Sequence, residues 1–230
     1  MLRFSDYEQL DEASKNLHLT HIEETIITEG SEGANNALGF LKGVRDMLSG
    51  STRSSVNITT KWDGAPAVFA GIDPADGKFF VGKKSVFNVE PQLYKTNADI
   101  DKYTSGDLNA KFKVALREFP KLGIKGVLQG DLMFTDDVST TSIDGQKFYT
   151  FQPNTIVYAV DVDSDFGRQV KSAKIGVVWH TTYTGKDLQS MKASFGVNIS
   201  GLKRVSSIWM DDATFKDVSG KATFTQKETD

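Results

Sequence analysis

Lys61 and Asp63 lie two residues apart in the stretch ITTKWDGAPAVFAG, residues 58–71, which otherwise has the composition of a β-strand. Because side chains alternate along a strand, a lysine and a carboxylate at this spacing lie on the same face. Gly64 and Pro66 follow directly. The pattern indicates either a solvated strand end or a lysine held beside a carboxylate for chemistry.

The chemistry of a lysine amine depends on its protonation. The amine is a nucleophile only when it is neutral, and at an ordinary pKa of about 10.4 it is mostly protonated at neutral pH. A neighbouring carboxylate favours the charged form, so Asp63 does not activate Lys61 by itself. Asp63 makes sense if it orients the amine, or if a metal and a triphosphate also enter the site. Gly64 would then let a ligand approach the backbone closely. The alternative is a surface Lys–Asp pair before a hairpin.

The elements that position this stretch follow from apolar periodicity and from turn residues. One helix is expected from Ser31, as its cap, to Gly50, and a second ends at Pro120. Helices are predicted at 28–50, 106–120 and 186–195, and strands at 58–62, 65–72, 77–87, 125–134, 148–162, 173–185 and 205–212. Strands outnumber helices and their connections are short or irregular. This favours an α+β fold with twisted antiparallel or mixed sheets flanked by helices, rather than a doubly wound fold.

Composition sets the class of protein. The chain has 230 residues with 39% hydrophobic and 25% charged residues, which is enough for a substantial core. We expect an N-terminal appendage at 1–28, one domain at 29–215 and a frayed tail at 216–230. The sequence contains no apolar run of membrane-spanning length and no signal peptide pattern. The absence of cysteine excludes disulfides and thiolate catalysis and fits a cytoplasmic protein.

The net charge of −3 argues against a strongly basic nucleic-acid coat. Local basic patches remain, and most clusters of this kind are solvated surfaces. Two groups stand out in the sequence: Lys78, Lys83 and Lys84, and then Lys111, Lys113, Arg117, Lys121 and Lys125.

Three other features of the sequence resemble known binding sites, but each lacks a residue or a spacing that the site requires. GKFFVGKK, residues 77–84, lacks the Ser or Thr that a P-loop needs, because Lys84 occupies that position. DVDSDFG, residues 161–167, has Phe166 where a calcium loop needs glycine, so a plain acidic loop is favoured. The histidines, at positions 18, 21 and 180, show no metal-binding spacing.

Lys61-Trp62-Asp63-Gly64 resembles motif I of the covalent nucleotidyltransferases, which include ATP-dependent DNA ligases, RNA ligases and mRNA capping enzymes. The order of the later segments is also similar over about residues 56–195. VGKKS resembles a motif with a basic residue near the nucleotide sugar, and VLQGDLMF resembles an acidic motif that binds ribose. IGVVWHTTYTGKDL resembles the strand whose aromatic residue stacks on the base.

The resemblance implies a role for each matched residue. Lys61 would be the nucleophile that attacks the α-phosphate and forms a lysyl-nucleotide, and Asp63 would position it. Thr60, Gly64, Lys83 and Lys84 would contact the nucleotide, and Asp131 would bind ribose or the metal. Trp179 would stack on the base, with His180 nearby. The implied cofactors are ATP and Mg²⁺, and the fold would be an ATP-grasp-like adenylation domain with ATP cradled by an antiparallel sheet.

The sequence also departs from the family. Asp131 stands where the family usually has Glu, and Pro66 stands where DNA ligases often have Arg. The late motifs Glu-Gly-Val-Val-x-Lys and Lys-x-Lys have no convincing match, which suggests a divergent or truncated ligase of the phage type. The implied activity is ATP-dependent sealing of a broken 5′-phosphorylated strand by a monomer, with DNA slightly favoured over RNA and roles in DNA repair and replication. The alternatives are a non-catalytic nucleotide-binding or structural module and a capping-type guanylyltransferase.

Overall fold

A computed structural model describes residues 22–48, 60–214, 225 and 227 of the chain. It divides the chain into two compact units, one containing Lys61–Ala213 and the other containing the helix α2, Ile22–Leu48. Residues 29–215 were expected to form one domain, whereas α2 is assigned to the second unit. Most of the predicted appendage at 1–28 and of the tail at 216–230 lies outside the described residues.

Helix α2 is interrupted at Gly30, which has φ 60° and ψ −129°. A residue with a Cβ is strained at such a positive φ, so glycine suits this position. Ser31 follows the interruption, at the place where the sequence predicted a helix to begin. Within the described part of the chain, no helix combines the length and the hydropathy that crossing a membrane requires.

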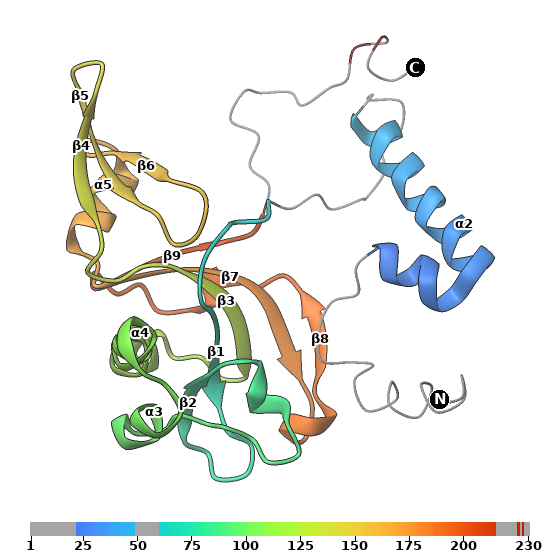
Figure 1. The fold of residues 1–230 in the computed structure, drawn as a ribbon, viewed down its shortest axis with the longest axis horizontal. Coiled ribbons are helices and arrows are strands. Elements are labelled where there is room, and N and C mark those ends of the chain that lie inside the picture. Colours follow the sequence, from blue (N-terminus) through green and yellow to red (C-terminus); the bar gives the residue numbers. More distant parts are fainter. Residues whose placement is uncertain (1–21, 49–59, 215–224, 226, 228–230) are drawn as a thin grey trace. The chain divides into compact units, whose positions relative to one another are not determined.

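The larger sheet of the Lys61–Ala213 unit has six strands (Figure 1). They are β1 (Ala67–Ile72), β2 (Phe79–Gly82), β3 (Val127–Phe134), β7 (Ile175–Thr184), β8 (Lys192–Phe195) and β9 (Ile208–Asp212). The order is β2-β1-β3-β7-β8, and β9 pairs with the other half of the same β7 edge. All pairs are antiparallel except β7 with β9. The expected α+β class with antiparallel and mixed sheets is therefore confirmed.

A smaller antiparallel sheet is built from β4 (Ser139–Ile143), β5 (Gln146–Phe151) and β6 (Tyr158–Asp161). Every residue of β4 is exposed, and in Figure 1 the β4–β5 hairpin extends away from the larger sheet. Helix α5, Asp165–Ser172, follows β6 and is capped by Ser164, whose hydroxyl accepts a hydrogen bond from the N–H of Gly167. The acidic stretch that imitates a calcium loop is thus the start of a helix.

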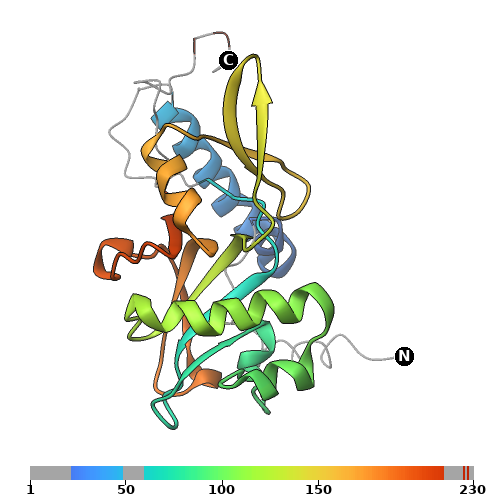
Figure 2. The same ribbon diagram turned by 90° about the vertical axis from the view of Figure 1, so that its left-hand side faces the viewer.

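One face of the larger sheet is covered by the helices α3, Asn97–Tyr103, and α4, Gly106–Glu118 (Figure 2). Alternate strand residues such as Val68, Leu128 and Val177 meet Phe112 and Ala115 of α4 in the largest core cluster. Helix α4 was predicted from this apolar stripe, and the structure confirms it.

The opposite face of the sheet carries two smaller apolar clusters. The first, around Phe69 and Tyr183, is covered by the short 3-10 helices η1, Lys84–Phe87, and η3, Leu188–Ser190. The second, around Met133 and Trp209, lies toward the smaller sheet and α5, and contains residues of both. The two clusters leave the middle of this face for polar residues.

Several predicted elements differ from the structure. The predicted helix at 186–195 is η3 followed by strand β8, because Asp187 caps only one short turn before the chain extends along β7. The predicted strand at 148–162 is two strands, β5 and β6, separated by a loop. The sequence analysis did not identify α3, α5 or β4.

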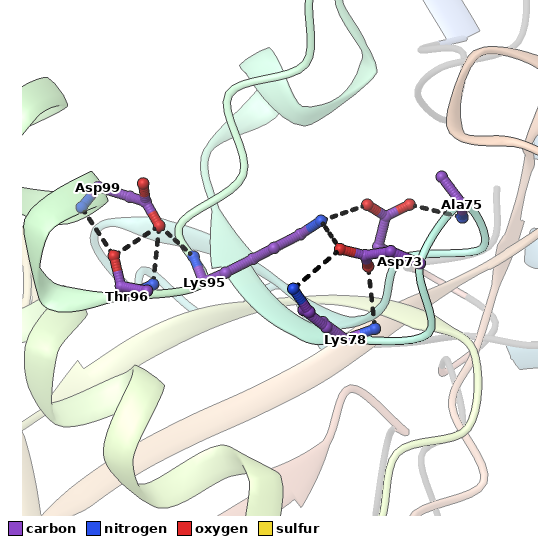
Figure 3. Close-up of polar contacts among 7 residues, drawn as sticks. Asp73, Ala75, Lys78, Lys95, Thr96 and Asp99 are labelled. Atoms are coloured by element: carbon purple, nitrogen blue, oxygen red, sulfur yellow. Dashed lines mark hydrogen bonds and ion pairs between the residues drawn. The ribbon is translucent and has the colours of Figure 1, made fainter.

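The turn between β1 and β2 is tied to the chain before α3 (Figure 3). The Lys95 ammonium donates to the buried carboxylate of Asp73 at 2.6 Å and to Asp76 at 2.9 Å. The next residue, Thr96, forms a capping box with Asp99 at the start of α3. These contacts fix the hairpin whose far end leads to Lys83, so they position that lysine indirectly.

Candidate functional site

The Lys61–Pro66 segment runs beside strand β3 before β1 begins. The N–H of Ala65 donates to the carbonyl of Leu132 at 2.9 Å, and the N–H of Leu132 donates to the carbonyl of Pro66 at 3.1 Å. A Cβ on Gly64 would lie 2.5 Å from the Cβ of Asp131, so no larger residue fits there without a shift. Gly64 therefore serves the approach of its own chain to β3, which places the Lys-Trp-Asp-Gly motif directly against Asp131.

The carboxylate of Asp63 is held by the loop between β5 and β6. One oxygen accepts from the Asn154 amide at 2.9 Å, and the other accepts from the N–H and hydroxyl of Thr155 at 2.9 and 2.8 Å and from the N–H of Ile156 at 3.2 Å. These hydrogen bonds, led by the Thr155 hydroxyl, lower the pKa of Asp63 to about 2. Asp63 thus anchors the motif to the smaller sheet, and any positioning of Lys61 acts through the backbone between them.

Lys61 is exposed and makes no hydrogen bond or ion pair with any residue in the described part of the chain. The residues on its C-terminal side are fixed at Asp63 and Gly64, so its backbone is held while its amine stays open to a reaction partner. Thr60, which the resemblance assigns to nucleotide contact, is exposed and belongs to the second unit.

Asp131 and His180 meet in the middle of the sheet face that the helices do not cover. The His180 Nε2 lies 3.7 Å from a carboxylate oxygen of Asp131, and its Nδ1 lies 2.8 Å from the Thr181 hydroxyl. A register shift in β3 between Gln129 and Gly130 leaves His180 without an opposite residue. About a fifth of each of the Asp131 and His180 side chains is exposed, so both can reach a ligand on this face.

Lys83 and Lys84 follow the end of β2, and the antiparallel register pairs Gly82 with Phe69 near the start of β1. The hairpin therefore returns these lysines to the end of the sheet where the Lys61–Pro66 segment lies. Lys83 is half-buried and Lys84 is exposed. Together with Asp131, which pairs with Ala67, they are brought to the same end of the sheet as the motif.

Trp179 lies on the opposite face. Its side chain is fully buried, and its ring packs on Phe119 with 5.2 Å between ring centroids. Gly130 allows this close packing, since a Cβ there would lie 2.8 Å from the Trp179 ring. A base needs an exposed ring face, so stacking on Trp179 does not fit this position. Trp179 is a core residue under the helices.

An aromatic pocket that the sequence analysis did not identify lies beside the motif, with a volume of about 320 Å³. Its aromatic walls are Trp62, Phe151, Tyr158, Phe166 and Trp209. The rings of Trp62 and Tyr158 stack with 5.4 Å between centroids, and the ring of Trp209 meets Trp62 edge-on at 6.1 Å. The Tyr158 hydroxyl also accepts the backbone N–H of Asp63 at 2.8 Å. Trp62, inside the motif itself, was the available signal for this pocket.

The polar groups of the aromatic pocket indicate what it accepts. Asp161, Asp211 and Ser164 line it, and none of the described lining residues is a lysine or an arginine. The indole N–H of Trp209 is buried and has no hydrogen-bond partner among the residues that the structure describes. Phe166 is 45% exposed at the pocket and leaves an apolar ring open to solvent. The pocket therefore suits a flat, uncharged ring with hydrogen-bonding edges better than it suits a phosphate.

A metal would find few protein ligands near the motif. Among the described residues, no group of three or more His, Asp or Glu side chains gathers closely enough to hold an ion. Magnesium, however, usually keeps several waters and binds one or two carboxylates together with substrate phosphates. One carboxylate, that of Asp131, is enough for a magnesium ion that is held mainly by waters and phosphates. It is not enough for a metal ion that is held by protein ligands only.

The interaction of Asp63 with the 154–156 loop gives a testable prediction. Asp63→Asn should lower the thermal stability at pH 7, because an amide cannot accept all four donors. Since folding lowers the pKa of Asp63 from 3.8 to about 2, the difference from wild type should be full above pH 4 and shrink as the pH falls toward 2. Thermal melts at several pH values and amide hydrogen exchange at Thr155 and Ile156 measure this. The exposed Asp163→Asn is the matched control, and equal effects from both variants would contradict the anchor.

One protein family matches the chain. No curated protein and no solved structure matches the chain. The profile of a family of unknown function, DUF6267, matches residues 16–230, a range that includes the Lys-Trp-Asp-Gly motif, Asp131 and every wall of the aromatic pocket. The chain therefore belongs to the DUF6267 family.

Proposed function

We propose that this protein is a covalent nucleotidyltransferase, with an ATP-grasp-like adenylation domain, that transfers a nucleoside monophosphate to Lys61 as the first half of ATP-dependent polynucleotide ligation. The observation that carries the proposal is that the Lys61 amine is open while the backbone of the Lys-Trp-Asp-Gly motif is held in place. Lys61 is exposed and has no partner in the described part of the chain, while Asp63 is held by the loop between β5 and β6 and Gly64 lies against strand β3. A nucleophile needs this combination of a free amine and a held backbone.

The reaction balances with groups that the site offers. The neutral amine of Lys61 attacks the α-phosphorus of ATP and forms a nitrogen–phosphorus bond. The bond from that phosphorus to the bridging oxygen of the β-phosphate breaks, and pyrophosphate leaves with the electron pair. Because Lys61 is exposed, the proton of the amine can pass to water. Lys83 and Lys84, at the same end of the sheet, supply positive charge for the phosphates.

The aromatic pocket supplies the site for the base. Trp62 is adjacent to Lys61 in the chain, so a base bound against Trp62 and Tyr158 would lie one residue away from the proposed nucleophile. A base also offers amino donors for a carboxylate of the pocket, Asp161 or Asp211. None of the described residues that line the pocket is a lysine or an arginine, so we propose that the phosphates lie outside it. This assignment replaces Trp179 as the stacking residue.

Asp131 is the residue that would hold Mg²⁺ together with the nucleotide phosphates. When bound, the ion would neutralise charge on the phosphates and on the departing pyrophosphate. The role of Asp131 is to accept a ligand bond from the ion or a hydrogen bond from the ribose, and His180 beside it limits the rotation of its carboxylate.

The second half of the proposed reaction passes the nucleotide from Lys61 to the 5′-phosphate of a broken strand, and a neighbouring 3′-hydroxyl then expels it. We propose that the protein carries out this step as a cytoplasmic monomer, and that it accepts a broken DNA strand slightly better than a broken RNA strand. We expect sealing to depend on contacts with phosphate and therefore to weaken as salt rises.

The experiment that tests the proposal is intact mass spectrometry after incubation with Mg²⁺ and ATP, GTP or NAD in turn. We expect a gain equal to one nucleoside monophosphate with ATP, and removal of that mass when pyrophosphate is added back. A gain with GTP instead would indicate a capping-type guanylyltransferase. Saturable binding of ATP with no gain in mass would contradict covalent chemistry and support a non-catalytic nucleotide-binding module.

A further inference from the structure

A band of cationic side chains lies where the end of α4 meets the loop before β9. Its members, named here the basic band, are Arg117, Lys121, Lys125, Lys174, Lys203 and Arg204. The segments are held together by their backbones, since the N–H of Lys203 donates to the carbonyl of Leu122 at 2.9 Å and the N–H of Lys174 donates to the carbonyl of Ser207 at 2.8 Å. The stem of Lys203 also lies over Gly123, 3.5 Å from where a Cβ would be.

Few negative charges oppose the basic band. Between Leu108 and Gly130 the sequence has one carboxylate, Glu118, and between Leu188 and Met210 it has none. Glu118 is buried beneath Arg117 and Lys121, whose side chains remain 56% and 46% exposed. Lys111 and Lys113 are paired with Asp107, Asp137 and Asp101, which balance their charges, so they are not counted in the band. The single carboxylate of Glu118 balances only one of the two charges of Arg117 and Lys121. A strong local excess of positive charge thus stands on a chain whose net charge is −3.

The surroundings of the basic band indicate the kind of partner. No large hydrophobic side chain is exposed among residues 104–142 or 196–214. Stable protein partners usually bury an apolar centre, and a membrane surface usually takes apolar side chains as well as cations. A band of cations without exposed apolar residues is the surface that a nucleic-acid backbone selects, through phosphate contacts.

We infer that the basic band is a docking surface for the phosphate backbone of a nucleic acid. It is formed by the end of α4, the residues that follow it up to β3, the residue before β7 and the loop before β9. None of its members belongs to the Lys61 motif or to the Lys83–Lys84 pair. The inference does not depend on transfer of a nucleotide to Lys61, because it follows from the charge on this surface. If both proposals hold, the band supplies the strand-binding contacts that the weakly charged Lys61 end lacks.

The test compares two triple variants with the same change in net charge. Lys125→Gln/Lys203→Gln/Arg204→Gln removes three charges from the basic band, and Lys147→Gln/Lys186→Gln/Lys192→Gln removes three exposed lysines elsewhere. Fluorescence anisotropy with a labelled oligonucleotide duplex and a labelled single strand measures Kd between about 50 and 200 mM salt. Thermal melts check that both variants fold.

We expect the band variant to bind at least about tenfold more weakly at the lowest salt, while the control stays within about twofold of wild type. The slope of log Kd against log salt should fall by about two units, since each lost phosphate contact contributes about 0.7 to 0.9. Equal losses in both variants, or no binding by the wild-type protein, would overturn the inference. So would tighter binding of a polyglutamate peptide or of anionic lipid vesicles than of either oligonucleotide.

A failure of this inference can be told apart from a failure of the proposed function. Self-labelling with ATP, measured by intact mass, should be the same in the band variant as in wild type. A band variant that loses labelling as well as nucleic-acid binding would show that the substitutions act on the Lys61 site or on the fold. That result would overturn the inference that the basic band is a binding surface separate from the Lys61 site.

Discussion

Lys61→Ala protein should acquire no nucleotide when it is incubated with ATP and Mg²⁺, with a labelling rate below about one part in a thousand of wild type. The expected loss is this large because the proposed step forms a bond to the Lys61 nitrogen itself, so no neighbouring group can substitute for it. The segment around Lys61 is anchored through Asp63 and Ala65, and the alanine variant should therefore keep the wild-type melting temperature.

Two control variants sharpen this test. Lys61→Arg keeps the positive charge but presents a guanidinium that stays protonated, so it should also fail to label. Lys84→Ala removes another exposed lysine at the same end of the sheet and should still label, with weaker affinity for ATP. Peptide mapping of the labelled wild type should place the nucleotide on Lys61. A mapped adduct on Lys83 or Lys84, or labelling that survives in Lys61→Ala, would refute the assignment of the nucleophile.

Glu118→Gln should lower the free energy of unfolding of the Lys61–Ala213 unit by about 2–3 kcal/mol at pH 7. The Glu118 side chain is 1% exposed and accepts from Lys121, Ser207 and Arg117 at 2.6, 2.6 and 2.8 Å. Burial alone raises the pKa of Glu118, but these three hydrogen bonds outweigh it and lower the pKa to about 2. The neutral amide leaves two cations without their buried counter-charge.

The pH dependence distinguishes this effect from a simple packing defect. Because folding lowers the pKa of Glu118 from 4.5 to about 2, its stabilisation is complete above pH 4.5 and is lost as the pH falls toward 2. Urea titrations of wild type and Glu118→Gln should therefore differ most at neutral pH and converge in acid. The exposed Glu90→Gln serves as the control. A gap between the two proteins that stays constant from pH 7 to pH 3 would mean that the charge of Glu118 is not the cause.

Local patterns in the sequence were sufficient for the elements whose signals are short-ranged. The apolar stripe of α4 and Pro120 after it predicted that helix, because the residues that bury a helix lie three and four apart in the chain. The segments that form β3 and β7, which begin Val-Leu and Ile-Gly-Val-Val, were also predicted as strands. The sequence also singled out Lys-Trp-Asp-Gly, since a lysine, a carboxylate and a glycine at this spacing are unusual in a strand.

The tertiary structure decided which side of each strand a functional residue occupies. Alternation separates Trp179 from Val178, but only the packing of α4 shows that the face of Trp179 is the buried one. The shift in register beside Gly130 then brings His180 close to Asp131, and no local pattern announces such a bulge.

The same limit applies to the partners of the motif. Asp63 binds Asn154 and Thr155, which are 91 and 92 residues away along the chain, and Trp62 meets Tyr158 and Trp209 from three separate segments. By itself the sequence singled out Lys61-Trp62-Asp63-Gly64 as a candidate motif, because that motif is contiguous. The aromatic pocket, the anchor of Asp63 and the basic band were decided by the tertiary structure, because each is assembled from segments that become neighbours only when the sheets pair.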